Sequence, residues 1–370
     1  MINDTNQTQT AGDNAQQIQG QNVTIINQIG ITEQRAREIC SEMFAVAKRD
    51  LTFEAEKTAL ERVNKLEDRL MPKMYRIEGA LENFADPSFQ VFLTKANKAA
   101  ACTDRESDYD LLSELLIHRI EKKNSRKDLV GLNRAVEIVD QITDEALNGL
   151  TVFFIVQSIN PVADSLENGL AILNNLYRKL PLTNLPKGNG WLDELDILDA
   201  VRSSSIGTLK KLEEYWTNVY SGFVSAGIKI GGEKWIEVTQ ILKDSGLSEK
   251  TLIPNVLLDG YVLVPVLNED SIDSLKQNMI SITDGSVIQV PISDAKKHTL
   301  HKIYSMYDKS SDLMNKVKKA FVEKLDSYYA IKTIRNWWNS IPHSADVTAV
   351  GRVLAHANAK RCDPSIPNLN

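Results

Sequence analysis

Hydrophobic residues recur at helical spacing along most of the chain. Between residues 60 and 70, leucine and valine lie three or four positions apart, with charged residues between them. Similar stripes follow within residues 111–120 and 129–139. Apolar positions at this spacing share one face of an α-helix. The pattern therefore predicts a mainly α-helical protein built around a multi-helix body.

Short apolar runs interrupt this pattern in the second half of the chain. Residues 233–265 follow an order of helix, turn, helix and strand, with the second helix expected near 248–258. This order is typical of a winged helix, which places its second helix in a nucleic-acid groove. The second helix carries only Lys250 and is interrupted by Pro254, so structural packing or protein binding is the favoured alternative. Residues 261–264 and 286–290 have the composition of strands that could pair with each other. We therefore expect a small β element near 260–290.

The first thirty residues have a different pattern, rich in Gln, Asn, Thr and Gly. They contain two charged residues, Asp4 and Asp13, and the first basic residue is Arg35. The centre of this tract combines β-branched and amide side chains, which suits short strands that pair with copies from neighbouring chains. We expect an oligomerisation stem here, with the apolar members Ile18, Val23, Ile25, Ile26 and Ile29. The alternative is a polar tail that happens to contain a few isoleucines.

These patterns predict five parts. Residues 1–31 form a disordered tail and β stem, and residues 32–75 form an amphipathic connecting helix. A helical bundle follows over 76–225. Residues 226–345 form a helical domain with a small β element, winged-helix-like at 233–265, and residues 346–370 form a C-terminal helix and tail.

Composition narrows the functional classes. The chain of 370 residues has a net charge of −6, which does not favour a general nucleic-acid binder. Its three cysteines are far apart in the sequence, as expected for reduced cytoplasmic thiols. No signal peptide and no apolar run long enough to span a membrane is evident. Phosphate-binding and dinucleotide-binding glycine motifs are absent, so we expect no cofactor.

Two acidic clusters are the strongest candidates for metal chemistry. Paired carboxylates hold divalent metals in nucleases, and the chain has acids at Asp104, Glu106, Asp108 and Asp110 and again at Asp193, Glu194, Asp196 and Asp199. Acids at the start of a helix are also expected without any metal, because the helix dipole favours them. A metal-dependent nuclease is therefore an alternative to a structural role.

Histidines provide three weaker candidates. His298 and His301 would share a helix face and could bind a metal, or be solvated. Cys362 near His343 and His356 could form a nucleophilic dyad, although it lies close to a Pro-rich end of the sequence. We expect His118, at the edge of an apolar stripe, to be structural.

Aromatic pairs at Tyr328-Tyr329 and Trp337-Trp338 raise a further question. Neighbouring residues on a helix point in different directions, so one of each pair could remain exposed and anchor a partner. Packing in the core is the alternative.

The chain resembles a bacterial family of cytosolic helical proteins with a Gln/Asn/Gly-rich N-terminal β stem. The resemblance covers most of the chain and rests on residues 12–27, 30–32, 86–90, 111–120 and 347–358. None of these motifs is chemical. Similar stems precede unrelated domains in bacterial conflict systems, so the resemblance implies, by association, a role in anti-phage defence or a related stress response.

Together these features predict a non-enzymatic, homo-oligomeric scaffold or sensor. Its expected partners are further copies of itself, joined through the stem, and a phage-derived trigger or an effector protein. We expect neither a membrane nor nucleic acid as a partner. The alternatives are the metal-dependent nuclease and a winged-helix nucleic-acid binder.

Overall fold

The computed structural model describes residues 54–55, 57–122, 126–161, 163–204, 207–280 and 287–369. The chain divides into two units, Met1–Lys57 and Thr58–Asn370. The predicted stem residues, together with most of the first half of the predicted connecting helix, lie outside the described residues. The account below therefore concerns the second unit.

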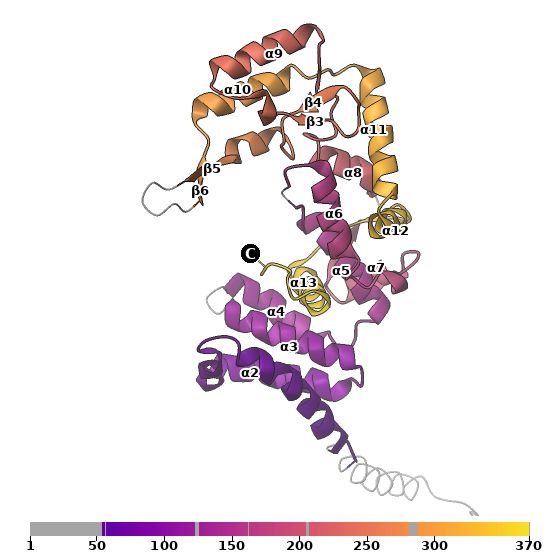
Figure 1. Ribbon diagram of the computed structural model, residues 1–370. Helices are drawn as coiled ribbons and strands as arrows, with labels where there is room; N and C mark the ends of the chain where they lie inside the picture. The colour runs from indigo at the N-terminus through magenta and orange to yellow at the C-terminus, as the bar shows by residue number, and fades with distance from the viewer. Residues whose placement is uncertain are drawn as a thin grey trace, which may run out of the picture. The chain divides into compact units, whose positions relative to one another are not determined.

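Helices dominate the described part of the chain, as the hydrophobic pattern predicted. The first of them ends at residue 74. It is followed by η1 (Ala80–Ala85), α2 (Pro87–Cys102), α3 (Glu106–Glu121), α4 (Arg126–Glu137), α5 (Asp144–Ser158), α6 (Leu166–Tyr177), η2 (Leu182–Asn184), α7 (Gly190–Ile197) and α8 (Leu212–Val219). The remainder are α9 (Glu233–Asp244), η3 (Glu249–Thr251), η4 (Glu269–Ser274), α10 (Asp294–Ser305), α11 (Ser311–Asp326), α12 (Tyr329–Trp338) and α13 (Ala349–Cys362) (Figure 1).

The described strands form three small antiparallel sheets. They pair β1 (Val201–Ser204) with β7 (Ser344–Val347), β4 (Tyr261–Leu263) with both β2 (Ile228–Lys229) and β3 (Ile253–Pro254), and β5 (Lys276–Ile280) with β6 (Val287–Pro291). The prediction that 261–264 pairs with 286–290 was therefore wrong. Strand β6 pairs instead with β5, because closing the short connection between them costs less chain entropy.

The second helix of the expected winged helix is also absent. Residues 248–258 contain the single 3-10 turn η3 and then strand β3, which ends at Pro254. Proline has no backbone N–H and fixes φ, so a helix cannot continue through this position. Helix α9 therefore lacks the following recognition helix that a winged helix would use.

Helix α13 packs among α3, α4 and α5, although it is more than 180 residues later in the sequence (Figure 1). Nearly every residue from Val350 to Ala359 is buried. The helix begins with Thr348, whose hydroxyl accepts from the backbone N–H of Gly351 at 3.1 Å and donates to the carbonyl oxygen of Asp199 at 2.6 Å. Small residues on α13 permit this close packing from several sides.

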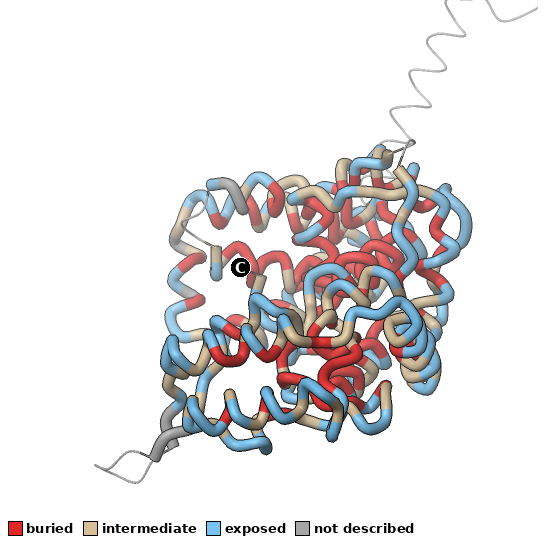
Figure 2. Tube along the Cα trace, turned by 90° about the horizontal axis from the view of Figure 1, so that it is seen from above, coloured by how far each residue is buried: buried red, intermediate tan, exposed pale blue. Residues whose placement is uncertain are grey.

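Buried side chains gather into two hydrophobic cores. The main core takes its members from Leu66 to Ala226, from Leu257, and from Val317 to Ile366. The second core lies within Ile228–Tyr307 and packs α9 and α10 against the sheet of β2, β3 and β4. In Figure 2 the buried residues follow the inner turns of the helices and the exposed residues follow the outer turns. The domain boundaries within 32–370 remain predictions.

Candidate functional site

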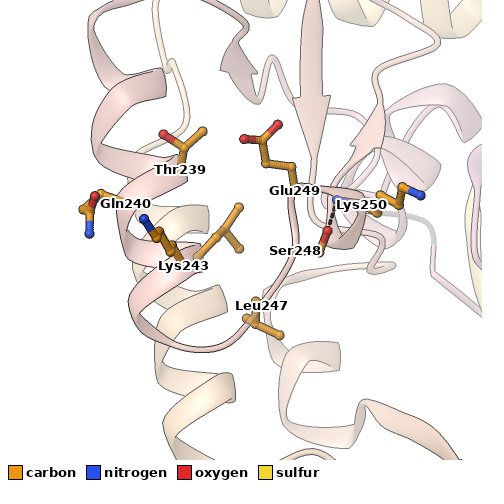
Figure 3. Close-up of a pocket in the computed structure, with 8 residues that line it drawn as sticks. Thr239, Gln240, Lys243, Leu247, Ser248, Glu249 and Lys250 are labelled. Atoms are coloured by element: carbon orange, nitrogen blue, oxygen red, sulfur yellow. Dashed lines mark hydrogen bonds between the residues drawn. The ribbon is translucent and has the colours of Figure 1, made fainter.

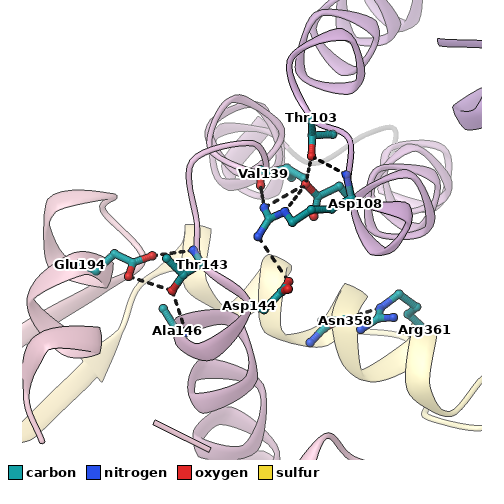
Figure 4. A network of polar contacts seen from close by, with 10 residues as sticks. Thr103, Asp108, Val139, Thr143, Asp144, Ala146, Glu194, Asn358 and Arg361 are labelled. Carbon is teal, nitrogen blue, oxygen red and sulfur yellow. Dashed lines mark hydrogen bonds and ion pairs between the residues drawn. The ribbon is translucent and has the colours of Figure 1, made fainter. Parts of the chain in front are cut away.

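The first acidic cluster is used in structural contacts at the start of α3 (Figure 4). Asp108 is fully buried, and its Oδ2 accepts from Thr103 Oγ1 at 2.6 Å and Arg105 Nε at 2.9 Å. Arg105 also donates to the carbonyl oxygen of Val139 at 2.9 Å and lies 3.3 Å from Asp144. The arginine thereby ties the start of α3 to the end of α4 and the start of α5. Burial raises the pKa of Asp108, against the effect of these donors.

The other carboxylates of this cluster face the preceding helix. Glu106 lies 2.6 Å from Lys65 and 3.0 Å from Arg69, and Asp110 lies 3.0 Å from Arg69. Asp104 is exposed. The four carboxylates therefore do not converge on one point.

The carboxylates of the second acidic cluster contact separate partners. Glu194 accepts from the backbone N–H of Thr143 at 2.7 Å and from its hydroxyl at 2.9 Å, while that hydroxyl accepts from Ala146 N and caps α5. Asp199 and Asp196 pair with Arg202, at 2.8 and 3.5 Å. Asp193 accepts a weak hydrogen bond from Asn189. Across the described ranges, no three His, Cys, Asp or Glu side chains are arranged to hold a metal ion.

His298 and His301, which could have bound a metal together, have different surroundings. His301 lies 3.2 Å from Asp273 and 3.6 Å from Glu269, both in or beside the turn η4, whereas His298 is exposed. Here His301 holds α10 to η4.

The Cys–His dyad that the sequence left open as an alternative is likewise not formed. His356 Nδ1 lies 3.0 Å from His118 Nε2 instead, and no hydrogen bond of the described residues joins Cys362 to a histidine. Burial raises the pKa of the Cys362 thiol, which opposes formation of the nucleophilic thiolate.

The His118–His356 pair is the feature that sequence reasoning missed. The two residues are 238 positions apart, on α3 and α13, and both are buried. Their ring centroids are 4.8 Å apart. The sequence does not pair them, because periodicity places a residue on a face of its own helix but does not identify the facing helix.

Hydrogen bonding fixes the tautomers of this pair. His356 Nε2 lies 2.7 Å from the carbonyl oxygen of Pro367, which can only accept, so Nε2 carries the proton. His356 Nδ1 is then an acceptor, and His118 Nε2–H donates to it. His118 Nδ1 is left as a buried acceptor without a partner among the described residues. Burial lowers both pKa values, that of His118 to about 3, and keeps the pair neutral.

A cavity of about 410 Å³ lies beside His356. The end of α5 and the residues that follow it form one side, and α13 forms another. The tail segment 366–369 closes a third side, and the His356–Pro367 hydrogen bond holds that segment in place.

A second hollow, of about 680 Å³, lies between α9 and the segment 247–250 (Figure 3). Thr239 and Lys243 line it from α9, and Ser248 and Glu249 line it from the opposite side. The polar side chains of Lys243, Glu249 and Lys250 are exposed, so this hollow is an open surface groove.

The aromatic pairs divide between core and surface. Trp337 and Trp338 are both buried, and their indole N–H groups donate to the carbonyl oxygens of Pro186 and Lys210, each at 2.9 Å. Tyr329 is 77% exposed. The packing interpretation is therefore correct for the tryptophans, and Tyr329 alone remains available as an exposed anchor among these four residues.

The fold and these contacts define a mainly helical protein whose buried polar groups connect helices that are distant in sequence. A family model with the description ":-like" matches residues 30–367, and the chain belongs to that family. The description names no activity. No curated protein and no solved structure matches the chain. No helix in the described ranges is both long enough and apolar enough to cross a membrane.

Proposed function

We propose that the protein is a homo-oligomeric scaffold or sensor that assembles through its N-terminal stem. The observation that supports a non-catalytic body is that its buried and partly buried polar groups are used in structural contacts. Arg105, Asp108, Glu194 and the His118–His356 pair all connect helices to one another. Polar contacts of this kind favour one packing arrangement of the helices, although Asp108 Oδ1 and His118 Nδ1 have no hydrogen-bond partner among the described residues.

The stem supplies the second half of the proposal. Residues 16–30 are too polar to form a core alone, yet their β-branched centre suits strands completed by neighbouring copies. Joining several bodies on one stem raises the effective concentration of each, so weak contacts with a trigger or an effector become strong together. We further propose bacterial origin, a cytoplasmic location and a role in anti-phage defence, with a phage-derived trigger. The support for these is the resemblance of the stem.

The stem proposal is tested by adding charge to its apolar positions. The double variant Val23→Asp/Ile25→Asp should convert the full-length oligomer into monomers, because unpaired carboxylates cannot be buried between strands. Thr8→Asp/Thr10→Asp adds the same two charges to the preceding polar tract and should leave the mass unchanged. Light scattering after size exclusion measures both. An unchanged mass for the first variant, or a monomeric wild-type protein, would exclude stem assembly.

The nuclease alternative makes a different prediction. Its metal would have to draw carboxylates of one acidic cluster away from Lys65, Arg69 or Arg202. A ligand that binds the native state raises its melting temperature, so a rise with millimolar Mn²⁺ that is absent in Glu106→Gln/Asp110→Asn would favour the nuclease.

A further inference from the structure

The cavity beside His356 has one charged residue among its described lining residues. Arg352 lies one helical turn before His356, so both side chains belong to the same face of α13. The guanidinium has no ion pair and no side-chain hydrogen bond to any described residue, and Arg352 is exposed. His356 is neutral and donates its only proton to Pro367. Arg352 is therefore an unused cation at the opening of the cavity.

Three acids on or directly after α3 and α13 are already engaged in other contacts. Glu114 pairs with Lys73 at 2.8 Å, and Asp363 pairs with Lys179 at 2.8 Å. Glu121 accepts from Asn368 Nδ2 at 3.0 Å, a contact that also holds the tail. No carboxylate of the lining itself can neutralise Arg352. The site thus favours an anion, and an arginine fork binds a carboxylate with two parallel hydrogen bonds.

The remaining walls are largely apolar, with one unused acceptor. Phe154 and Ile366 are buried at 6% and 4% exposure, and Ile159 and Leu369 are partly buried. Asn160 Oδ1 is buried and has no hydrogen-bond partner among the described residues. A buried acceptor without a donor is costly, so a ligand that supplies an O–H or N–H at this place would be favoured.

We propose that this cavity binds a small carboxylic acid with an apolar body and a hydrogen-bond donor beside the carboxylate. The carboxylate pairs with Arg352, the donor bonds to Asn160 Oδ1, and the apolar body contacts Phe154 and Ile366. A volume of about 410 Å³ lies within the range of small-molecule sites. This proposal goes beyond stem assembly and does not depend on it.

Three probes separate the parts of the proposal in calorimetric titrations of the full-length protein. The first is 3-phenyllactate, the second is 3-phenylpropanoate, which lacks the hydroxyl, and the third is 2-phenylethanol, which lacks the carboxylate. We expect affinity to fall in that order. Absence of saturable binding of 3-phenyllactate up to about 10 mM, or equal binding of 2-phenylethanol, overturns the proposal.

Matched variants then assign the roles. Arg352→Gln should weaken binding of 3-phenyllactate by about tenfold or more and abolish its advantage over 2-phenylethanol. Arg178→Gln removes the same charge at an exposed position outside the cavity and should change nothing. Equal binding by wild type and Arg352→Gln overturns the proposal.

Asn160→Ala tests the donor contact through a ratio that a general structural change would not alter. It should bring the affinities of 3-phenyllactate and 3-phenylpropanoate together. An unchanged ratio overturns the assignment of the donor to Asn160. Ligand binding and assembly can both be measured on the full-length protein. Loss of ligand binding without loss of assembly, or the reverse, therefore distinguishes failure of this proposal from failure of stem assembly.

Discussion

Individual buried histidines make the stability of this protein depend on pH. Burial lowers the pKa of His118 to about 3 and also lowers that of His356. Unfolding releases both imidazoles to an ordinary pKa near 6.5. The free energy of unfolding therefore does not depend on this pair above pH 6.5. It decreases as the pH falls from 6.5 toward 3, because the unfolded chain then binds more protons than the folded chain.

His118→Gln tests this dependence while retaining an N–H donor for His356. Below pH 6.5 the wild-type free energy of unfolding should fall more steeply than that of the variant, by about 1.4 kcal/mol per pH unit for each proton involved. Urea unfolding at several pH values between 6.5 and 4.5 measures the two slopes. His298→Gln changes an exposed histidine and should keep the wild-type slope. Parallel pH profiles for wild type and His118→Gln would contradict the prediction.

Helix α13 depends on a residue without a side chain at its closest contact. A Cβ on Gly351 would lie 2.0 Å from the carbonyl oxygen of Ala200 and 3.0 Å from Val347 Cγ1. The backbone near Ala200 cannot move freely, because its carbonyl also accepts from the backbone N–H of Thr348 at 3.1 Å. This contact joins α13 to the start of β1.

Gly351→Ala should therefore destabilise the protein by about 1–3 kcal/mol, since overpacking exceeds the gain in helix propensity. Gly190→Ala, at the start of α7, is the matched control, because no atom lies within 4 Å of its added Cβ. That variant should be neutral or stabilising by up to about 1 kcal/mol. Urea unfolding midpoints at constant m-value report both. Equal stability of Gly351→Ala and wild type would contradict the prediction, because it would mean that α13 shifts to accommodate the Cβ at no cost in free energy.

In the part of the chain that the structure describes, the buried members of both cores lie beyond residue 65. We therefore expect a chain lacking residues 1–30 to retain its helical circular dichroism and a cooperative unfolding transition. If stem assembly is correct, the same truncation will be monomeric while wild type is oligomeric. Loss of helical signal on truncation would show instead that the N-terminal tract is part of the folded body.

The sequence by itself determined the helical class and most element positions, because those depend on local periodicity. The stripe of apolar residues within 111–120 predicted a helix, and α3 forms there. The strand of residues 261–264 was also read correctly, whereas its partner was not, since pairing depends on which strand lies beside it. The helix expected over 248–258 failed where Pro254 breaks it.

Only the tertiary structure decided what the polar residues do. The sequence grouped carboxylates by proximity along the chain, but helix geometry turns neighbours to different partners, as Glu106 and Asp108 illustrate. It could not join His118 to His356, because their contact arises from the packing of α13 against α3. The cavity beside Arg352 depends on that same packing and on the tail folding back along α13. Local pattern fixes which residues form a helix, whereas long-range burial selects which side chains meet.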